Sequence, residues 1–264
     1  MTGNDSHWER GGLLDAIDAA LAASGKAPDA LTVDDLVPLD QFHGGGKAAT
    51  LRLARLAGLS PGMRVLDVGG GLGGPARTLA VEFGCTVTVV DLTASYVHAG
   101  AALTARVGLA ARVAHRMGDA LALTDADGAY DVVWTQNAGM NIADKEALYA
   151  GFHRVLRNGG ILALQEPMRG PGGPSVLPLM WARDAATDHL RTPEAMRATI
   201  AAAGFRAQMW DDVTLEFSGT AAGASVHTIQ YLVHGDALAE ILRTARRNRD
   251  EGRIVMVQAV FARA

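Results

Sequence analysis

Short apolar runs alternate with amphipathic segments through the middle of the chain. Five runs are rich in β-branched residues and bounded by glycine or polar residues, which predicts buried strands at 63–68, 86–91, 112–117, 130–135 and 160–165. Helices are expected between them, the clearest at about 93–107 and 144–157. This regular alternation predicts an α/β fold, a doubly wound, Rossmann-like and mostly parallel sheet with helices on both faces.

The flanking segments extend the pattern. We expect a mobile tail at 1–12, a short helical turn near 33–37, and amphipathic helices at 13–23, 47–59 and 238–248. Thr192, Pro193 and Glu194 combine an N-cap residue with good first-turn residues, so a helix should begin there. Strand-like runs at 205–213 and 254–261 are separated by long helical segments, which suggests a reversed last strand.

Residues 168–191 break the alternation of strand and helix. Their proline- and glycine-rich start predicts a loop, and 176–190 is expected to be partly helical, as a small helical cap over the site. We therefore divide the chain into N-terminal helices with a lid loop at 1–60 and a core at 61–264. The core carries the cap insertion near 168–191 and a helical segment near 215–250.

Composition narrows the class of protein. The chain has 264 residues, is 49% apolar and 20% charged, and has a net charge of −4, which argues against general nucleic-acid binding. Five late arginines (243, 246, 247, 249 and 253) are interpreted as a solvated helix face. Cys85 is the single cysteine, so a reducing compartment is expected. No signal segment or membrane span is recognisable, which predicts a soluble, cytoplasmic protein.

The strand at 63–68 leads into a turn crowded with glycines. Gly69, Gly71 and Gly74 fit the pattern G-x-G-x-x-G, and Asp91 ends the next strand about 20 residues further on, where ribose hydroxyls bind in nucleotide sites. NAD and S-adenosylmethionine (SAM) both carry such a ribose, so the glycines alone leave the cofactor open. Asp67 is awkward beside a pyrophosphate but suits a ligand with an ammonium group.

Polar residues recur where the predicted parallel strands end. They are Asp91, Asp119, Gln136, Asn137 and Glu166. Because ligands bind beyond the carboxyl ends of such strands, these side chains indicate one site along one edge of the sheet.

Residues 40–46, Asp-Gln-Phe-His-Gly-Gly-Gly, are expected to close over a ligand as a lid. His43 is the best general base by residue type, since its unperturbed pKa is about 6.5. A hydrogen bond that caps the loop is an equally open interpretation of His43. Within the cap, Arg169 is a candidate partner for a carboxylate and Trp181 for an apolar or cation–π wall.

Five stretches carry a family resemblance: VLDVGGGLGG, VVDLT, GDALAL, YDVVWTQNAGMNIADK and HRVLRNGGILALQEP. In this order they resemble the class I SAM-dependent methyltransferases, from about residue 40 to 214. DQFHGGG and TQNAGMNIADK are more narrowly similar to the small-molecule group that contains sarcosine and dimethylglycine N-methyltransferases. That group is similar to tocopherol, sterol and quinone C-methyltransferases. Asn137 is a departure, because related sequences often have His there.

The resemblance implies a SAM site, with S-adenosylhomocysteine (SAH) as product. The residues implied to bind the cofactor are Gln41, Asp67, Gly69, Gly70, Gly71, Gly73, Asp91, Leu92, Asp119, Ala120, Leu121 and Gln136. In this scheme Asp91 takes the ribose hydroxyls and Asp67 lies near the ammonium. Asp119 and Ala120 hold the adenine edge. Gln41 and Gln136 lie by the methionine portion.

The remaining predicted site residues concern the acceptor. His43 and Asn137 are the candidate catalytic residues, and those predicted to bind substrate are Met140, Asn141, Glu166, Arg169 and Trp181. No metal site is expected, because the histidines lack the spacing of metal ligands.

We expect a SAM-dependent methyltransferase that methylates a small-molecule amine by in-line displacement. The alternative is a C- or O-methyltransferase acting on an apolar natural-product, prenyl or quinone-like substrate, which the apolar residues 176–181 favour. A NAD-dependent oxidoreductase and a SAM-binding protein without transfer activity are rival classes. The partners expected are a small-molecule substrate and no nucleic acid, with no membrane span and with the protein a monomer or homodimer.

Overall fold

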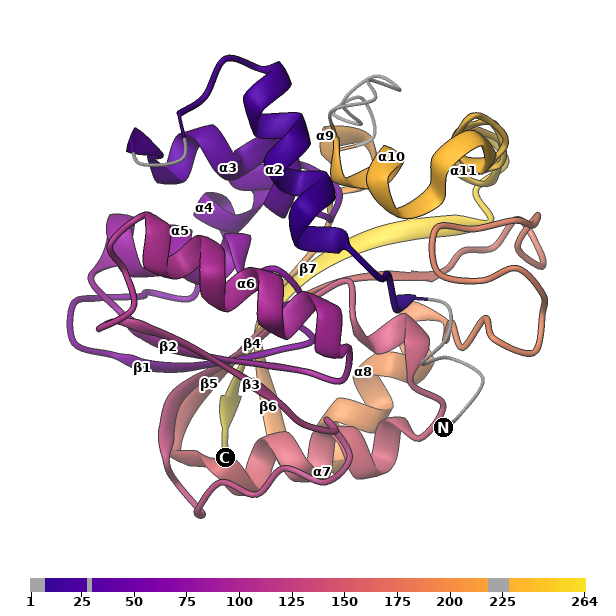
Figure 1. The fold of residues 1–264 in the computed structure, drawn as a ribbon. Helices are drawn as coiled ribbons and strands as arrows, with labels where there is room; N and C mark the ends of the chain where they lie inside the picture. The colour runs from indigo at the N-terminus through magenta and orange to yellow at the C-terminus, as the bar shows by residue number, and fades with distance from the viewer. Residues whose placement is uncertain (1–7, 28–29, 218–227) are drawn as a thin grey trace.

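The computed structural model describes residues 8–27, 30–217 and 228–264. Seven strands form one sheet in the order β3-β2-β1-β4-β5-β7-β6 (Figure 1). They are β1 (Arg64–Val68), β2 (Thr86–Asp91), β3 (Val113–Met117), β4 (Tyr130–Gln136), β5 (Leu156–Arg169), β6 (Phe205–Asp212) and β7 (Ile254–Arg263). The pairs among β1 to β5 are parallel, and β7 is antiparallel to both β5 and β6. The mostly parallel sheet with a reversed last strand is confirmed.

Helices cover both faces of the sheet. The described helices are α2 (Leu13–Ala23), α3 (Val33–Asp40), α4 (Gly46–Leu56), α5 (Gly74–Phe83), α6 (Ala94–Arg106), η2 (Gly139–Asn141), α7 (Lys145–Val155), α8 (Pro193–Ala202), α9 (Thr214–Phe217), α10 (Ile229–His234), η3 (Gly235–Ala237) and α11 (Leu238–Asp250). In Figure 1, α4, α5 and α6 lie on one side of the sheet, with α2 and α3 outside them, and α7 and α8 lie on the other.

Each face of the sheet has its own apolar core. Leu53, Leu79, Val87 and Trp134 belong to the core under α4 and α5. The opposite core joins the other side chains of the same strands to α7 and α8, as with Phe152. Strands buried on both faces read as continuous apolar runs, which is why the central strands were visible in the sequence.

The order of the strands reverses at β1 and β4, which are neighbours although β1 is followed by β2 in the chain. In such sheets the ligand crevice lies outside the carboxyl ends of the strands at this point. The sheet therefore directs attention to the glycine turn after β1 and to the residues that follow β4.

Several expectations are wrong in detail. Residues 176–190 form no helix; they are bends and turns whose apolar side chains pack into a cluster with Met140. The segment at 33–37 is part of a full helix to Asp40, because Thr32 and Asp35 form a reciprocal capping box. The fifth strand begins at Leu156, four residues before the predicted start, and continues to Arg169.

The expected mobile tail is docked where it is described. The Arg10 amide donates to Ser95 Oγ (3.3 Å), and Arg10 Nε donates to the carbonyl of Val233 (3.0 Å). Trp8 contacts Phe42 edge to face. The polar and aromatic anchors of this segment are too few to show in hydrophobic periodicity.

Residues 218–227, within the expected helical segment near 215–250, lie outside the described residues. Among the helices that are described, none is long and apolar enough to cross a membrane.

Candidate functional site

The turn between β1 and α5 is built from glycines that side chains could not replace. Gly69 has φ 71°, and a Cβ there would lie 2.3 Å from Cβ of Ala138, which follows β4. A Cβ on Gly70 would lie 2.5 Å from Asp67 Oδ2. The backbone of this turn is therefore kept bare between two strand ends, as a close ligand approach requires.

Two carboxylates flank the turn. Asp67 is almost fully buried, and its Oδ2 has no hydrogen-bond partner among the described residues. Asp91 accepts hydrogen bonds from the amides of Gly71 and Thr93, both at 2.9 Å. Burial raises the pKa of Asp67 to about 8, with a smaller contribution from the charge of Asp91, and burial also raises the pKa of Asp91. An ammonium group at Asp67 would relieve that cost, so the pair fits an amino-acid group beside a ribose.

Apolar side chains are exposed beyond Asp91. Leu92 is 49% exposed and Leu121 is 44% exposed, and they follow the ends of β2 and β3. Asp119 accepts from the amide of Leu121 (2.8 Å), which fixes the loop after β3. Exposed leucines beside a fixed polar loop fit a flat heterocycle such as adenine. The residues present thus fit the ammonium group, the ribose and the adenine of SAM.

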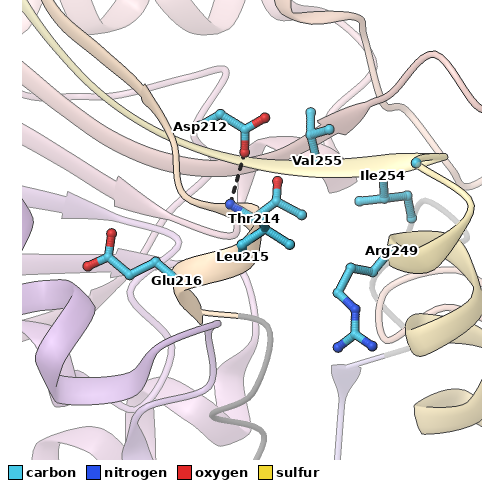
Figure 2. Close-up of a pocket in the computed structure, with 8 residues that line it drawn as sticks. Asp212, Thr214, Leu215, Glu216, Arg249, Ile254 and Val255 are labelled. Carbon is cyan, nitrogen blue, oxygen red and sulfur yellow. Dashed lines mark hydrogen bonds between the residues drawn. The ribbon is translucent and has the colours of Figure 1, made fainter.

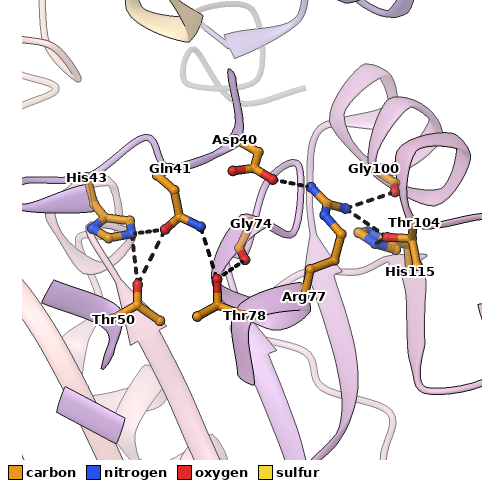
Figure 3. A network of polar contacts seen from close by, with 10 residues as sticks. All are labelled: Asp40, Gln41, His43, Thr50, Gly74, Arg77, Thr78, Gly100, Thr104 and His115. Carbon is orange, nitrogen blue, oxygen red and sulfur yellow. Dashed lines mark hydrogen bonds and ion pairs between the residues drawn. The ribbon is translucent and has the colours of Figure 1, made fainter. Parts of the chain in front are cut away.

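The first residues of the lid loop are held against α5 by polar contacts. Asp40 and Arg77 form a buried ion pair at 2.8 Å, and a Cβ on Gly74 would lie 2.2 Å from the carbonyl oxygen of Asp40 (Figure 3). Gln41 is also buried, and its Nε2 donates to Thr78 Oγ1 at 3.4 Å. The structure therefore places Gln41 against the N-terminal half of α5, and its implied role beside the methionine portion stays a prediction.

His43 lies inside a polar cluster (Figure 3). Its Nε2 is 3.0 Å from Gln41 Oε1 and 3.2 Å from Thr50 Oγ1. Its Nδ1 is 3.4 Å from Gln136 Nε2 and 3.2 Å from the carbonyl of Gly44. Burial lowers the pKa of His43 to about 4, so the ring is neutral near pH 7. Both nitrogens are engaged within the protein, and the role of general base stays a prediction.

The end of β4 has an unusual backbone. Asn137 has φ 55°, the left-handed region that asparagine tolerates better than most residues. Its Oδ1 is buried, and no described residue forms a hydrogen bond with it. Asn141 accepts from Trp8 Nε1 at 3.3 Å. Met140 is buried beside Trp181 in the apolar cluster of residues 177–190. Asn137 and Met140 therefore stand at the boundary between the glycine turn and the insertion.

Glu166 forms hydrogen bonds with the backbone at this boundary. Its Oε1 accepts from the amide of Gly139 (2.8 Å), while Oε2 has no hydrogen-bond partner in the part of the chain that the structure describes. Burial raises the pKa of Glu166. Lys145 is also buried, and its Nζ donates to the carbonyls of Gly139 (2.7 Å), Ile142 and His189 (3.0 Å). Together they fix the η2 turn and join it to the insertion.

The two residues predicted from the insertion differ in setting. Trp181 is buried, and its Nε1 donates to Asp188 at 3.1 Å. Arg169 is exposed at the end of β5, and its backbone amide donates to the carbonyl of Arg191 (2.9 Å). Trp181 therefore lies with the proposed acceptor wall, whereas nothing in the structure directs the side chain of Arg169 to it.

A cavity of about 500 Å³ lies elsewhere on the same edge of the sheet, between α9, the end of α11 and the start of β7 (Figure 2). Asp212, Thr214, Glu216, Arg249 and Ile254 are among its lining residues. None of the predicted site residues lines this cavity, so we keep it apart from the candidate site. In the described part of the chain, no group of three or more His, Cys, Asp or Glu residues is arranged to hold a metal ion.

Sequence reasoning missed several residues of the site. Thr50 lies inside a helix, and its contact with Gln136 (3.0 Å) joins segments far apart in the chain. Lys145 reads as an ordinary first-turn helix residue. One signal was available in the sequence, namely a polar residue within an apolar strand. Gln165 and Gln258 are both such residues.

Comparison with known proteins agrees with this geometry. Residues 65–160 match the family described as "Methyltransferase domain". The chain is 30% identical over 173 residues to a phosphoethanolamine N-methyltransferase of Triticum aestivum, covering 66% of this chain and 34% of that protein. It is 39% identical over 108 residues to 2-methyl-6-phytyl-1,4-hydroquinone methyltransferase of a Synechocystis species, covering 41% and 33%. The chain thus spans about a third of the length of these curated relatives.

Solved structures show the same fold. A geranyl diphosphate methyltransferase in complex with SAM has a TM-score of 0.69 at 20% identity, covering 83% of this chain and 85% of that one. Phosphoethanolamine N-methyltransferase 2 of Haemonchus contortus has a TM-score of 0.72 at 20% identity, covering 94% and 60%. At these identities the likeness concerns the fold alone.

Proposed function

We propose that this chain is a class I SAM-dependent methyltransferase that transfers the methyl group of SAM to a small-molecule amine; its match to a methyltransferase domain over residues 65–160 and its methyltransferase relatives support this. The observation that carries the proposal is the pair of carboxylates at the bare glycine turn. Asp91 is tied to the amide of Gly71 at 2.9 Å, and Asp67 Oδ2 is buried beside Gly70 without a partner in the ranges that the structure describes.

SAM supplies, when bound, a sulfonium methyl group that is already strongly electrophilic. The residues of this chain then have to align the acceptor and exclude water. Good alignment alone is worth on the order of 7–11 kcal/mol of the barrier. The carboxyl end of β4 is surrounded by the lid loop, the η2 turn and Trp8. These elements are therefore placed to align the acceptor and to exclude water.

An amine acceptor is supported by the chemistry of the site and by relatives. The phosphoethanolamine N-methyltransferase and a glycine/sarcosine/dimethylglycine N-methyltransferase of Actinopolyspora halophila (30% identical over 131 residues) both act at nitrogen, as their names state. Burial lowers the pKa of an amine, so a dry pocket itself helps the acceptor to lose its proton. This matters here because the lowered pKa of His43, about 4, makes its ring a weak base, and Glu166 Oε1 is occupied by the amide of Gly139.

A second candidate is a C- or O-methyltransferase with an apolar acceptor. The observation that favours it is the cluster of Met140, Leu179, Trp181 and Leu190, which adjoins the η2 turn. A relative that methylates a hydroquinone, by its name, is consistent with such a wall.

The test is release of SAH from SAM over a panel of acceptors. Glycine and its N-methyl derivatives, phosphoethanolamine and other amines form one arm; phenols, hydroquinones, prenyl compounds and carbon acids form the other. Turnover with an amine supports the proposal, and turnover confined to the second arm replaces it with the alternative. Tight SAM binding without turnover on either arm would contradict both. A monomeric or homodimeric state and a cytoplasmic location stay predictions.

A further inference from the structure

Three glutamines stand side by side on neighbouring strands. Gln136 on β4 is opposite Gln165 on β5, and Gln165 is opposite Gln258 on β7. All three are buried, on the face of the sheet that α4 covers. They continue the apolar rows of that face, such as Trp134 on β4. Burying an amide costs free energy unless each of its N–H groups meets an acceptor. The orientation of each amide in the row therefore depends on the orientation of its neighbour, so that the hydrogen bonds run in one direction.

The direction is fixed at one end by Arg52. A guanidinium group can only donate, and Arg52 Nη1 is 2.6 Å from Gln258 Oε1. The amide nitrogen of Gln258 therefore faces the other way, towards Gln165 Oε1 and the carbonyl of Ala49, both at 2.9 Å. Gln165 in turn donates to the carbonyl of Gly44 at 2.8 Å. Two backbone carbonyls, which can only accept, agree with this order.

At Gln136 the direction is fixed by the row together with Trp134. The indole N–H of Trp134 can only donate, and it is 3.0 Å from Gln136 Oε1. The Gln136 amide nitrogen is then a donor, directed to Gln165 Oε1 and to His43 Nδ1, both at 3.4 Å. His43 Nδ1 must therefore accept, and the proton of the neutral ring sits on Nε2. Nε2 donates to Gln41 Oε1 at 3.0 Å.

One contact favours the other tautomer. His43 Nδ1 is 3.2 Å from the carbonyl of Gly44, a distance at which a protonated Nδ1 would donate. That carbonyl already accepts from Gln165 at 2.8 Å. The other tautomer would also leave one Gln136 N–H without an acceptor, whereas the Nε2–H tautomer satisfies both N–H groups.

The chain of donors ends at the glycine turn. Because Gln41 Oε1 accepts from His43, its amide nitrogen is turned to Thr78 Oγ1 at 3.4 Å. The hydroxyl of Thr78 donates in its turn to the carbonyl of Gly74 (3.0 Å). Gln41 is thus held with its N–H groups, and not its oxygen, towards the start of α5. A weak bond at 3.4 Å leaves this donor available to a stronger acceptor.

The glutamine row consists of Gln136, Gln165 and Gln258. We propose that Arg52 and this row are positioning residues that hold His43 in the Nε2–H tautomer. As a result, Gln41 presents an N–H group to the carboxylate of SAM. This last step rests on the proposed function. His43 itself acts through Gln41 in this arrangement. The opposite tautomer would favour a reversed Gln41, with an oxygen facing that carboxylate.

The first test is the tautomer of His43, read from ¹⁵N resonances of the ring in the ligand-free protein near pH 7. Wild type is expected to show a protonated Nε2 and an unprotonated Nδ1. Arg52→Met should give a mixture, while Arg52→Lys, which keeps a donor-only group, should restore the wild-type pattern. Arg55→Met is the matched control, because Arg55 is exposed on the same helix. A protonated Nδ1 in wild type, or an unchanged ring in Arg52→Met, would overturn the proposal.

The second test compares binding of SAH and of methylthioadenosine, which lacks the amino-acid portion. Arg52→Met and Gln258→Leu should weaken SAH binding about ten-fold and leave methylthioadenosine binding unchanged. An equal loss for both ligands would mean a general structural defect and would overturn the proposal. If wild type binds neither ligand, the proposed function fails and the carboxylate role of Gln41 fails with it. The tautomer measurement still decides the role of the row.

Discussion

Asp91 is the side chain on which donor binding depends most directly. Two backbone amides hold its carboxylate in place for the ribose hydroxyls that we propose it binds. Weakening those charged hydrogen bonds should cost about 1.5–3 kcal/mol of SAH binding, or roughly ten- to hundred-fold in Kd. Asp91→Asn tests this by titration calorimetry. Asp127→Asn is the control, since Asp127 is exposed and pairs with Arg154. Equal affinity in Asp91→Asn and wild type would show that this carboxylate does not hold the nucleoside.

His43 should make stability depend on pH. Burial lowers its pKa from 6.5 to about 4, so the unfolded chain takes up the proton first as the pH falls. The stability contributed by the neutral ring is present above pH 6.5 and is lost as the pH falls towards 4, by about 3 kcal/mol at most. The measurement is urea unfolding of wild type and His43→Asn across this range. His115, whose pKa burial also lowers to about 4, is common to both proteins and cancels. A constant difference between them at all pH values would contradict the buried, neutral ring.

At the scale of elements, a buried ammonium group helps to hold the η2 turn to the insertion, together with the packing of Met140 on Trp181. Lys145→Met would leave the carbonyls of Gly139, Ile142 and His189 without their donor, at a cost on the order of 3 kcal/mol in the free energy of unfolding. Lys26→Met is the control, because Lys26 is half exposed and its ion pair with Asp35 is expected to contribute less than about 1 kcal/mol. Similar losses in the two variants would show that Lys145 is not a structural pin.

The elements themselves were largely predictable. Runs such as 86–91 and 254–261 are apolar on both faces, and Thr192 with Pro193 marks the start of α8 as expected. The insertion was not predictable, because its apolar residues, Leu179 and Trp181 among them, pack as separate anchors on Met140 with no repeating period. The apolar residues of the short segment 176–190 have a helix-like spacing by chance.

The site was predictable only in part, because the sequence does not show which residues of neighbouring strands lie opposite one another. The glycine turn and Asp91 lie within one βαβ unit, so local sequence identifies them. Gln165 and Gln258 are far apart in the chain, and only the strand order β4-β5-β7 places them beside Gln136. A sequence shows that a polar residue interrupts a strand, but it does not show which partner meets it.

For the whole molecule, binding of the methyl donor should appear as thermal stabilisation. A ligand present at 100 times its Kd adds about 2.7 kcal/mol, which corresponds to a rise in Tm of roughly 5–10 °C for a chain of this size. SAH should produce such a shift in a melting experiment, and NAD at the same concentration should not. Stabilisation by NAD in place of SAH would overturn the assignment of the glycine turn to SAM.

The placement of β7 between β5 and β6 also bears on biosynthesis. β7 follows β6 in the chain, so a nascent polypeptide that has reached β6 cannot yet join that strand to the sheet. Until β7 emerges from the ribosome, the nine residues of β5 from Ile161 to Arg169 present an unpaired edge, the kind of surface that chaperones must shield from other chains. The methyl-donor half of the molecule, β1 to β4, can form while translation continues. The half that contains Gln258 can be completed only after β7 has been synthesised.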